Sequence, residues 1–468
     1  MIFYSLLAVV FLSPLPYGSN RPWSWSLCIL LISLLGSCWA IHYLFSKKNV
    51  AIFHATKAII DIIIAFFCVI FWGFIQQSNN LLPSFNHPLW KIKNELLNTN
   101  TGFISLAVTD THLTLLRYIS YALVFWLSLC YSQTVTNARK ILQGFMLMGF
   151  IYSLYGLIMV LGHFDLIIFK KIPDLHFVSS TFINHNHFAT FAGLTLLCCL
   201  ALLHQNIVIA ASYYRGGNLG LQLFLENLII RAWFPLLAFI TIGTALMLSN
   251  SRGGFFSSIL GLIVLLLGLN SHKKSRNKKM FGGFMALIAI SSVIFYISSD
   301  SLVDRLNTQG LNDPLRKETY QLVWKAILTN PYVGFGAGSF SESFTLYKSL
   351  GIAGGINYPY FWDYAHNTYL ETIFELGFPC AILLFYCFFR LAFICLKGLF
   401  IRKKDWLYAA IGLAATVLIA SHALVDFSLQ IPAVAYCYFL LMGSACGQSF
   451  SSIKPKVKSA QHKNLVLC

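Results

Sequence analysis

The residues best suited to chemistry lie in the stretch FWDYAHNTYLETIFELG, at 361–377, where a polar loop turns into an apolar helix. Here His366 is preceded by one acid, Asp363, and followed by two, Glu371 and Glu375. A histidine titrates near neutral pH, so its imidazole can accept a proton from a hydroxyl group. The acids could orient the ring or act as rival bases. The pattern alone fits a structural histidine at a membrane interface equally well.

Polar side chains also occupy two expected helix starts. Asn367 follows the histidine directly, where its side chain could cap the helix. Asn184 and His187 lie in TFINHNHFAT, at 181–190, whose amides and imidazoles could cap a helix or hydrogen bond a sugar. Two histidines without further ligands at compatible spacing do not make a zinc site. We therefore predict Asn367, Asn184 and His187 as substrate contacts, and no metal.

Two arginines form a candidate anion site. Arg252 lies in LSNSRGG, at 248–254, a short turn between two apolar runs. A guanidinium at membrane depth usually faces a polar cavity, and its donors fit phosphate oxygens in pairs. Arg316 could supply a second cation, with Arg305 as the nearby alternative. Snorkelling of Arg252 to lipid headgroups and simple solvation of the loop arginines explain the same positions without a ligand.

Two other stretches are polar near the same expected face. His422 and Asp426, in SHALVDFSLQIPA, share one helix face and could form a buried polar pair or part of a substrate cavity. The turn NRPW at 20–23 combines polar and aromatic residues. An anchor in the aromatic belt of a membrane is its simplest interpretation.

The composition defines the class of protein that must position these residues. Hydrophobic residues make up 57% of the 468, and charged residues only 10%, which is too little polar surface for a soluble globule. Apolar runs of about 20 residues, the length that crosses a bilayer, recur along the chain. We predict an all-α polytopic membrane protein with about twelve transmembrane helices. The spans are expected near 2–16, 25–45, 58–75, 112–130, 141–162, 188–204, 232–249, 254–270, 280–298, 367–395, 408–425 and 431–449.

The positive charge predicts the orientation in the membrane. Most of the 33 Lys and Arg residues fall in alternate loops, as in the cluster at 273–279 and the tail at 450–468. Positive loops stay in the cytoplasm, so the net charge of +17 reflects topology and does not indicate nucleic-acid binding. Both termini are then cytoplasmic. The candidate site faces the opposite side, and the cytoplasmic loops leave no room for an ATPase module.

The predicted organisation has a long outer loop between two sets of helices. Its parts are 1–298 with transmembrane helices 1 to 9, 299–366 as a periplasmic cap loop, 367–449 with helices 10 to 12, and 450–468 as a basic cytoplasmic tail. The loop is too long to be a mere connector. Its first half predicts an amphipathic helix that begins at Pro314 and ends before Pro331. Its second half, rich in glycine and aromatic residues, predicts irregular backbone over a cavity.

Several short motifs, taken in order, resemble the O-antigen ligase and polymerase superfamily. They are SNSRGG at 249–254, an arginine and a tryptophan separated by seven residues at 316–324, NPYVGFGAGSF at 330–340 and AHNTYLETIFELG at 365–377. TFINHNHFA, NRPW and LVDFSLQIPA are also similar to segments of bacterial members. The resemblance is strongest from about residue 180 to 435.

The resemblance implies a membrane glycosyltransferase of the GT-C type in the bacterial inner membrane. Such enzymes move a glycan from undecaprenyl diphosphate to an acceptor hydroxyl on the periplasmic side. They use no nucleotide sugar and no cofactor, and the ligases require no metal. Carried onto this sequence, Arg252 and Arg316 hold the diphosphate and His366 is the catalytic base. Arg305 remains the alternative second contact.

The expected reaction is ligation of O-antigen to lipid A-core in lipopolysaccharide biosynthesis. A polymerase acting on a second lipid-linked repeat and a ligase acting on a protein hydroxyl share the same motifs. No carboxylate pair suited to double displacement is evident, which favours a single inverting displacement. A transporter, for example of bicarbonate, would be a different class. Midplane charges and an internal repeat are typical of transporters, and the sequence shows neither.

Overall fold

The computed structural model describes residues 1–45, 56–164, 166–167, 170–171, 177–214, 216–271, 282, 314–349 and 363–450. Within these ranges the chain is helical apart from short loops and one hairpin of two short strands, β1 (Leu166–Ile167) and β2 (Lys170–Lys171). The longer helices are α1 (Ile2–Leu12), α2 (Pro22–Phe45), α4 (Ile60–Gln76), α5 (Leu89–Leu97), α6 (Val108–Tyr131), α7 (Val135–Leu161), α8 (His185–Ala211), α9 (Gly217–Leu248), α10 (Arg252–Asn270), α13 (Pro314–Thr329), α15 (Thr368–Ile401), α16 (Leu407–His422) and α17 (Pro432–Phe450).

The helices support the predicted class of protein. Seven of those described, α2, α6, α7, α8, α9, α10 and α15, are long and apolar enough to cross a membrane, and α1, α4 and α16 are shorter apolar helices. Every predicted span inside the described ranges coincides with a helix. The span expected near 280–298 lies outside the described residues. The architecture is therefore that of a polytopic helical membrane protein, and the total of twelve spans stays a prediction.

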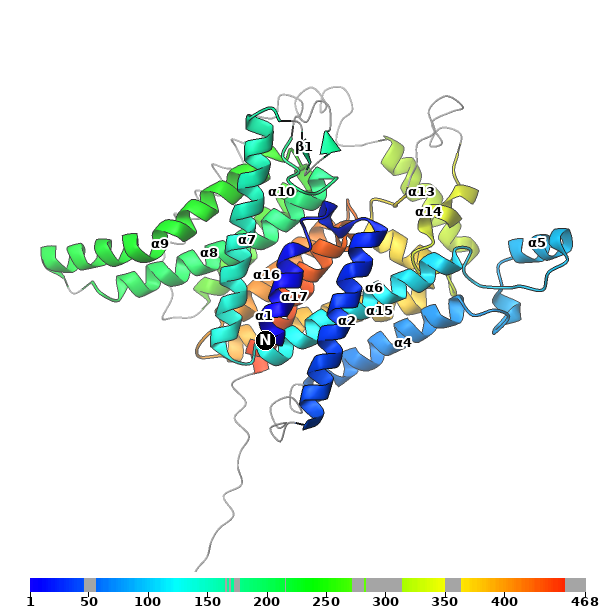
Figure 1. Ribbon diagram of the computed structural model, residues 1–468, viewed down its shortest axis with the longest axis horizontal. Coiled ribbons are helices and arrows are strands. Elements are labelled where there is room, and N and C mark those ends of the chain that lie inside the picture. The colour runs from blue at the N-terminus through cyan, green and yellow to red at the C-terminus, as the bar shows by residue number, and fades with distance from the viewer. Residues whose placement is uncertain are drawn as a thin grey trace, which may run out of the picture.

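Two helix boundaries differ from the prediction for identifiable reasons. The first helix ends at Leu12 instead of near residue 16, because Pro14 and Pro16 lack the amide hydrogen that would continue it. Helix α9 begins at Gly217, well before the expected residue 232. Its first half extends away from the bundle beside the end of α8 (Figure 1). Because that half contains polar residues, the pattern of apolar runs does not predict it as part of the helix.

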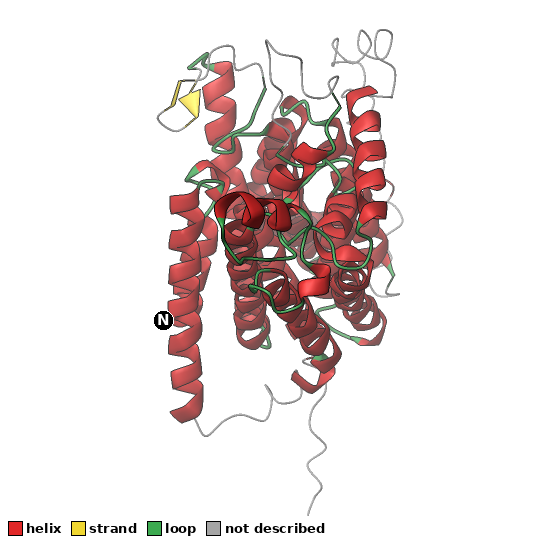
Figure 2. Cartoon of the chain, turned by 90° about the vertical axis from the view of Figure 1, so that its right-hand side faces the viewer, coloured by secondary structure: helices red, strands yellow, loops and turns green. Residues whose placement is uncertain are grey.

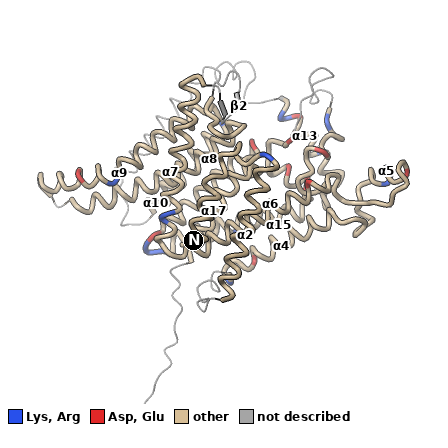
Figure 3. Tube along the Cα trace, in the orientation of Figure 1, with Lys and Arg blue, Asp and Glu red and all other residues tan. Residues whose placement is uncertain are grey.

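The bundle is built around α8 and α17, whose side chains are buried along most of their length. Helix α17 packs closely on α6 because of small residues. A Cβ added to Gly443 would lie 2.4 Å from the Phe125 carbonyl oxygen, so only glycine permits this approach. Many of the long helices run roughly side by side (Figures 1 and 2). Charged residues are sparse along them and gather toward their ends (Figure 3).

The outer-loop helix predicted from Pro314 is present as α13. Its residues Thr319, Val323, Ala326 and Ile327 are buried, whereas Leu315, in its first turn, is exposed. The buried face packs with aromatic residues from the glycine-rich segment and from the start of α15. The described part of the cap loop is therefore folded onto the helix that follows His366.

The glycine-rich segment is held against a kink in α15. Gly377 has a φ of 74° inside the helix, and Gly334 has a φ of 69° in the loop. A Cβ at Gly334 would lie 2.3 Å from the Glu375 carbonyl oxygen, and one at Gly377 the same distance from that of Tyr332. The two backbones touch, and the amide of Phe335 donates to the Phe374 carbonyl oxygen at 3.0 Å. This contact fixes the first turns of α15, and with them the position of His366.

Candidate active site

A buried carboxylate, Asp426, lies at the centre of three histidines. It follows α16 in the turn before α17 and is 1% exposed. Its oxygens lie 3.7 Å from Nδ1 of His366, 3.8 Å from Nε2 of His187 and 3.9 Å from Nε2 of His422. The Ser428 hydroxyl donates a hydrogen bond of 2.8 Å to the same carboxylate. Residues from three separate helix ends therefore meet at one negative charge.

Backbone contacts fix this turn against the start of α15. The Asp426 amide donates to the His422 carbonyl oxygen at 3.0 Å, which continues the helical spacing of the two residues. The Thr368 hydroxyl donates to the Asp426 carbonyl oxygen at 2.9 Å, and the Thr368 amide to that of Ala423, also at 2.9 Å. The carboxylate and the His366 segment are therefore held as one unit.

His366 differs from the other two histidines in its access. Its side chain is 26% exposed, compared with 4% for His187 and 2% for His422. Its backbone φ is 51°, a left-handed conformation that is uncommon outside glycine. The Tyr320 hydroxyl, from α13, donates to its carbonyl oxygen at 2.8 Å, and its ring meets the Phe427 ring edge to face at 4.9 Å. Of the three histidines, His366 has the most exposed side chain.

The electrostatics keep Asp426 ionised. Burial alone would raise the pKa of its carboxyl. The neighbouring His366, His187 and His422, together with the Ser428 hydroxyl, lower that pKa well below its ordinary value. At neutral pH the carboxylate is therefore a fixed negative charge beside the imidazoles. It favours a proton on Nδ1 of His366 and leaves Nε2 free to accept one.

Both described candidate arginines belong to elements that contact this same turn. Nη1 of Arg316 donates to the Val425 carbonyl oxygen at 3.2 Å. Arg252 is the first residue of α10 and follows its cap, Ser251. The next residue, Gly253, is so close to the turn that an added Cβ would lie 2.9 Å from Val425 and 3.0 Å from the His422 ring. The elements that carry Arg252 and Arg316 therefore meet at the turn of Asp426. The role of these arginines as anion contacts stays a prediction, and Arg305 lies outside the described residues.

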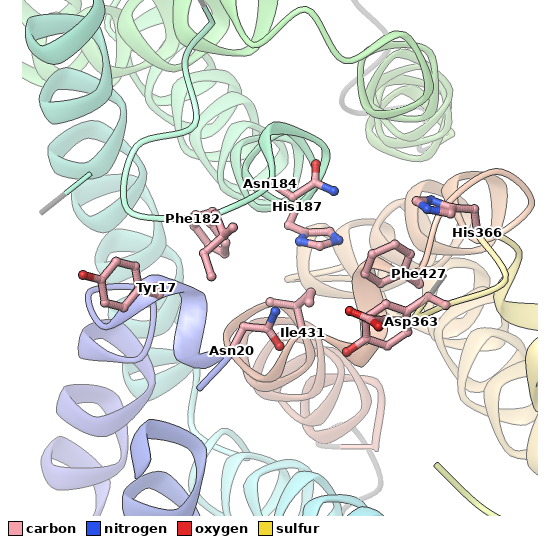
Figure 4. A pocket seen from close by; sticks show the side chains of 11 residues that line it. Tyr17, Asn20, Phe182, Asn184, His187, Asp363, His366, Phe427 and Ile431 are labelled. Carbon is pink, nitrogen blue, oxygen red and sulfur yellow. The ribbon is translucent and has the colours of Figure 1, made fainter. Parts of the chain in front are cut away.

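A cavity of about 260 Å³ opens beside His366. Four segments line it, namely the turn between α1 and α2, the start of α8, the residues before α15 and the turn before α17. Their side chains face one another around the opening (Figure 4). The lining residues are Tyr17, Asn20, Phe182, Ile183, Asn184, His187, Asp363, Tyr364, His366, Phe427 and Ile431.

The predicted substrate contacts divide between this cavity and the helix caps. Asn184 and His187 line the cavity, and the Asn184 side chain also caps α8 by accepting from the Asn186 amide at 2.8 Å. The Asn367 side chain caps α15 by accepting from the amides of Tyr369 and Leu370. Its own amide group donates to the Leu424 carbonyl oxygen at 3.0 Å. Capping therefore accounts for the Asn367 side chain, and its role as a substrate contact stays a prediction.

The carboxylate beside His366 is Asp426, whereas Glu371 and Glu375 serve other groups. Oε2 of Glu371 accepts from the Ala365 amide at 2.7 Å, and Oε1 accepts from Nε2 of Gln430 at 2.6 Å. Glu375 accepts from a backbone amide of the glycine-rich segment, that of Phe340, at 3.3 Å. Sequence reasoning had paired Asp426 only with His422. The nearness of His366 depends on tertiary packing and leaves no local signal.

The three histidines and Asp426 are not arranged as ligands of one ion. Among the described residues, no group of three or more His, Cys, Asp or Glu side chains could hold a metal. The arrangement is instead suited to proton transfer, since one imidazole is accessible and a buried carboxylate supports it. The chemistry available to this site is activation of a hydroxyl group near a cationic region.

Comparison with known proteins relates part of the chain to one family. Residues 237–385 match the family model described as O-antigen ligase. No curated protein matches the chain. The matched segment includes Arg252, Arg316 and His366, whereas Asp426 lies beyond its end. Residues 237–385 are therefore similar to the O-antigen ligase family, in agreement with the resemblance predicted from the motifs.

Proposed function

We propose that this protein is a membrane glycosyltransferase that transfers a glycan from undecaprenyl diphosphate to an acceptor hydroxyl, and that its reaction is O-antigen ligation to lipid A-core. The observation that carries the proposal is the position of His366, between the buried Asp426 carboxylate and an open cavity. The match to the O-antigen ligase family supports the same class of reaction.

In the proposed reaction His366 is the general base. Asp426 orients the ring through Nδ1, and Nε2 takes the proton of the acceptor hydroxyl as its oxygen attacks the anomeric carbon. The imidazolium that forms is stabilised by the adjacent carboxylate, as in other pairs of histidine and aspartate. A positioned base of this kind contributes roughly 10²- to 10⁴-fold to the rate.

The arginines serve the leaving group in this proposal. The bond between the anomeric carbon and the phosphate oxygen breaks, and undecaprenyl diphosphate departs with the electron pair. Arg252 and Arg316 neutralise the charge that develops on the diphosphate. Arg252 is the first residue of α10, next to the turn that carries Asp426, and the N-terminus of a helix favours anions. Attack opposite the leaving group inverts the anomeric centre in one displacement, without a metal.

The proposed location follows from the charge distribution. The protein lies in the bacterial inner membrane, with the site on the periplasmic face, where lipid-linked glycan and lipid A-core meet. Both termini are then cytoplasmic. This orientation is tested by accessibility of single cysteines placed at Asn98 and at Asn227, which the proposal puts on opposite faces.

Replacement of the base tests the chemistry directly. We expect His366→Ala to lower the rate of glycan transfer by roughly 10²- to 10⁴-fold, measured with lipid-linked donor and the purified full-length protein. His112→Ala, which removes an exposed histidine at the start of α6, is the matched control and should transfer normally. Full transfer by His366→Ala, in protein that inserts normally, would contradict the assignment.

Deletion of the gene distinguishes the acceptors. Full-length polymer on undecaprenyl diphosphate together with bare lipid A-core indicates a ligase. Core that bears a single repeat indicates a polymerase instead. Normal lipopolysaccharide with unglycosylated protein indicates a ligase that acts on protein. Each outcome is read from the same strain by electrophoresis of lipopolysaccharide and analysis of the lipid-linked pool.

A further inference from the structure

The cavity beside His366 and the elements that carry the arginines contact the turn of Asp426 through different residues. Arg316 contacts this turn at Val425, and Gly253, the neighbour of Arg252, approaches Val425 and His422. None of these residues lines the cavity, which instead receives the Phe427 ring. Two of the described histidines, His366 and His187, line the cavity and lie beside Asp426, and His366 is the more exposed of the two. The site therefore has a cationic side and a cavity side, with the proposed base between them.

The cavity has the wrong charge for a diphosphate and suitable chemistry for a sugar. Its described lining contains no Lys or Arg and includes the carboxylate of Asp363. The amides of Asn20 and Asn184 both donate and accept hydrogen bonds, as sugar hydroxyls require. Tyr364 stacks on Phe427 with ring centroids 4.0 Å apart, which gives the wall an aromatic surface. Such a lining repels phosphate and accommodates a neutral polyol.

A buried group without a partner also indicates a ligand. His187 lines the cavity and is only 3% exposed, and its Nε2 lies 3.8 Å from an Asp426 oxygen but makes no hydrogen bond to any described residue. A buried polar atom left in this state costs free energy, about 1 to 3 kcal/mol for an unsatisfied donor or acceptor. A hydroxyl group bound in the cavity would satisfy it.

Close packing and a hydrogen bond fix the wall of the cavity that lies opposite His366. The turn at 17–20 is held by Gly18, with a φ of 67°, whose added Cβ would lie 2.6 Å from the Phe182 ring. The Thr181 hydroxyl donates to the Pro14 carbonyl oxygen at 2.6 Å, which ties this turn to the start of α8. Asn20 is therefore presented to the cavity by a fixed backbone. The enclosed volume, about 260 Å³, is close to the lower end of roughly 300 to 1,000 Å³ for small-molecule sites, which suits a single sugar unit.

We infer that this cavity binds the sugar that bears the acceptor hydroxyl, and that Asn20 and Asp363 select it. The inference rests on the proposed function, because it assigns the donor diphosphate to the arginines and the acceptor sugar to the cavity of the same site. In a single inverting displacement, the attacking oxygen and the leaving diphosphate lie on opposite faces of the anomeric carbon. With the diphosphate at the arginines, the acceptor must approach from the cavity, where His366 can take its proton.

The test measures each Michaelis constant separately with the purified full-length protein. The probes are undecaprenyl-diphosphate-linked glycan and lipid A-core, both extracted from a strain that lacks the gene. We expect Asn20→Ala and the isosteric Asp363→Asn each to raise KM for lipid A-core about tenfold, the loss expected for one hydrogen bond. KM for the donor should stay unchanged. Arg252→Lys should show the opposite pattern.

A control variant and the pattern of the two Michaelis constants separate failure of this inference from failure of the proposed function. Asn227→Ala removes an amide in the cytoplasmic half of α9, where it bonds only its own helix, and should alter neither constant. If Asn20→Ala and Asp363→Asn raise the donor KM instead, the cavity holds the donor sugar and the inference is wrong. The inference is also wrong if neither constant changes. If the wild-type protein transfers nothing from this donor to this acceptor, the proposed function itself fails.

Discussion

Two sets of buried carboxylates flank the His366 segment, and they differ in the groups that they contact. Asp426 is surrounded by three imidazoles and a hydroxyl group. Glu371 and Glu375 instead accept hydrogen bonds from backbone amides and, for Glu371, from the Gln430 side chain. All three are almost fully buried. The difference lies in the partners, since imidazoles can exchange protons near neutral pH and backbone amides cannot.

The comparison separates a chemical role from a structural one. A carboxylate among imidazoles controls their protonation, so its loss should act mainly on the rate. A carboxylate among amides fixes the backbone, so its loss should act mainly on stability. Glu371 is the sharper example, because it joins the Ala365 amide, next to His366, to Gln430, which lies in the same connecting segment as Asp426. Substitutions in the two sets should therefore give different kinds of defect.

The largest effect is expected at Asp426. Asp426→Asn keeps the shape of the side chain but removes the charge that favours a proton on Nδ1 of His366. We expect kcat to fall by about 10²- to 10⁴-fold. KM for both substrates should stay unchanged, since the residue acts through the histidine. Initial rates at varied donor and acceptor concentrations measure this separation.

The matched control is Asp110→Asn, at the exposed start of α6, which should leave kcat and both KM values intact. A purely structural role for Asp426 would leave the activity of the folded fraction normal, whatever the change in melting temperature. That result would remove the distinction between the two sets of carboxylates.

A smaller effect, on stability, is expected at Glu371. Glu371→Leu keeps a similar volume but removes both acceptor oxygens, so the Ala365 amide and the Gln430 side chain both lose a partner. The expected cost is about 1 to 3 kcal/mol for each unsatisfied group, seen as a lower melting temperature in detergent. In the matched variant Glu371→Gln, the Gln430 amide can turn its oxygen toward the new donor and both hydrogen bonds are kept, so the melting temperature should stay close to that of the wild type. An unchanged melting temperature in Glu371→Leu would contradict the structural role.

Much of the fold could be predicted because its signals are local. Apolar runs of bilayer length predicted the helices, and Pro314 and Asn367 marked helix starts that the structure confirms. The early end of α1 and the long polar half of α9 were missed. The length of an apolar run shows neither where a proline ends a helix nor where a helix continues into polar residues. The motifs also predicted the family. Each motif is short, but their order along the chain makes the resemblance specific.

The site was less predictable because its decisive contacts join distant parts of the chain. The resemblance singled out His366, but local spacing favoured Asp363, Glu371 and Glu375 as its acidic partners. The observed partner, Asp426, comes from the turn after α16. Asn20 was interpreted as part of an aromatic anchor, although it lines the cavity. Periodicity can show that such residues share an end of the bundle, but only packing determines which of them meet.

The smallest expected effect concerns the pH dependence of stability. The pKa of Asp426 is lowered in the folded protein, so its ionised form contributes stability above the ordinary Asp pKa of about 3.9. This contribution is lost only as the pH falls through the lowered folded value. The difference in melting temperature between wild type and Asp426→Asn should therefore be constant from pH 8 to about pH 5 and shrink in stronger acid. A difference that already shrank between pH 7 and 5 would mean that a histidine, and not Asp426, carries the coupling.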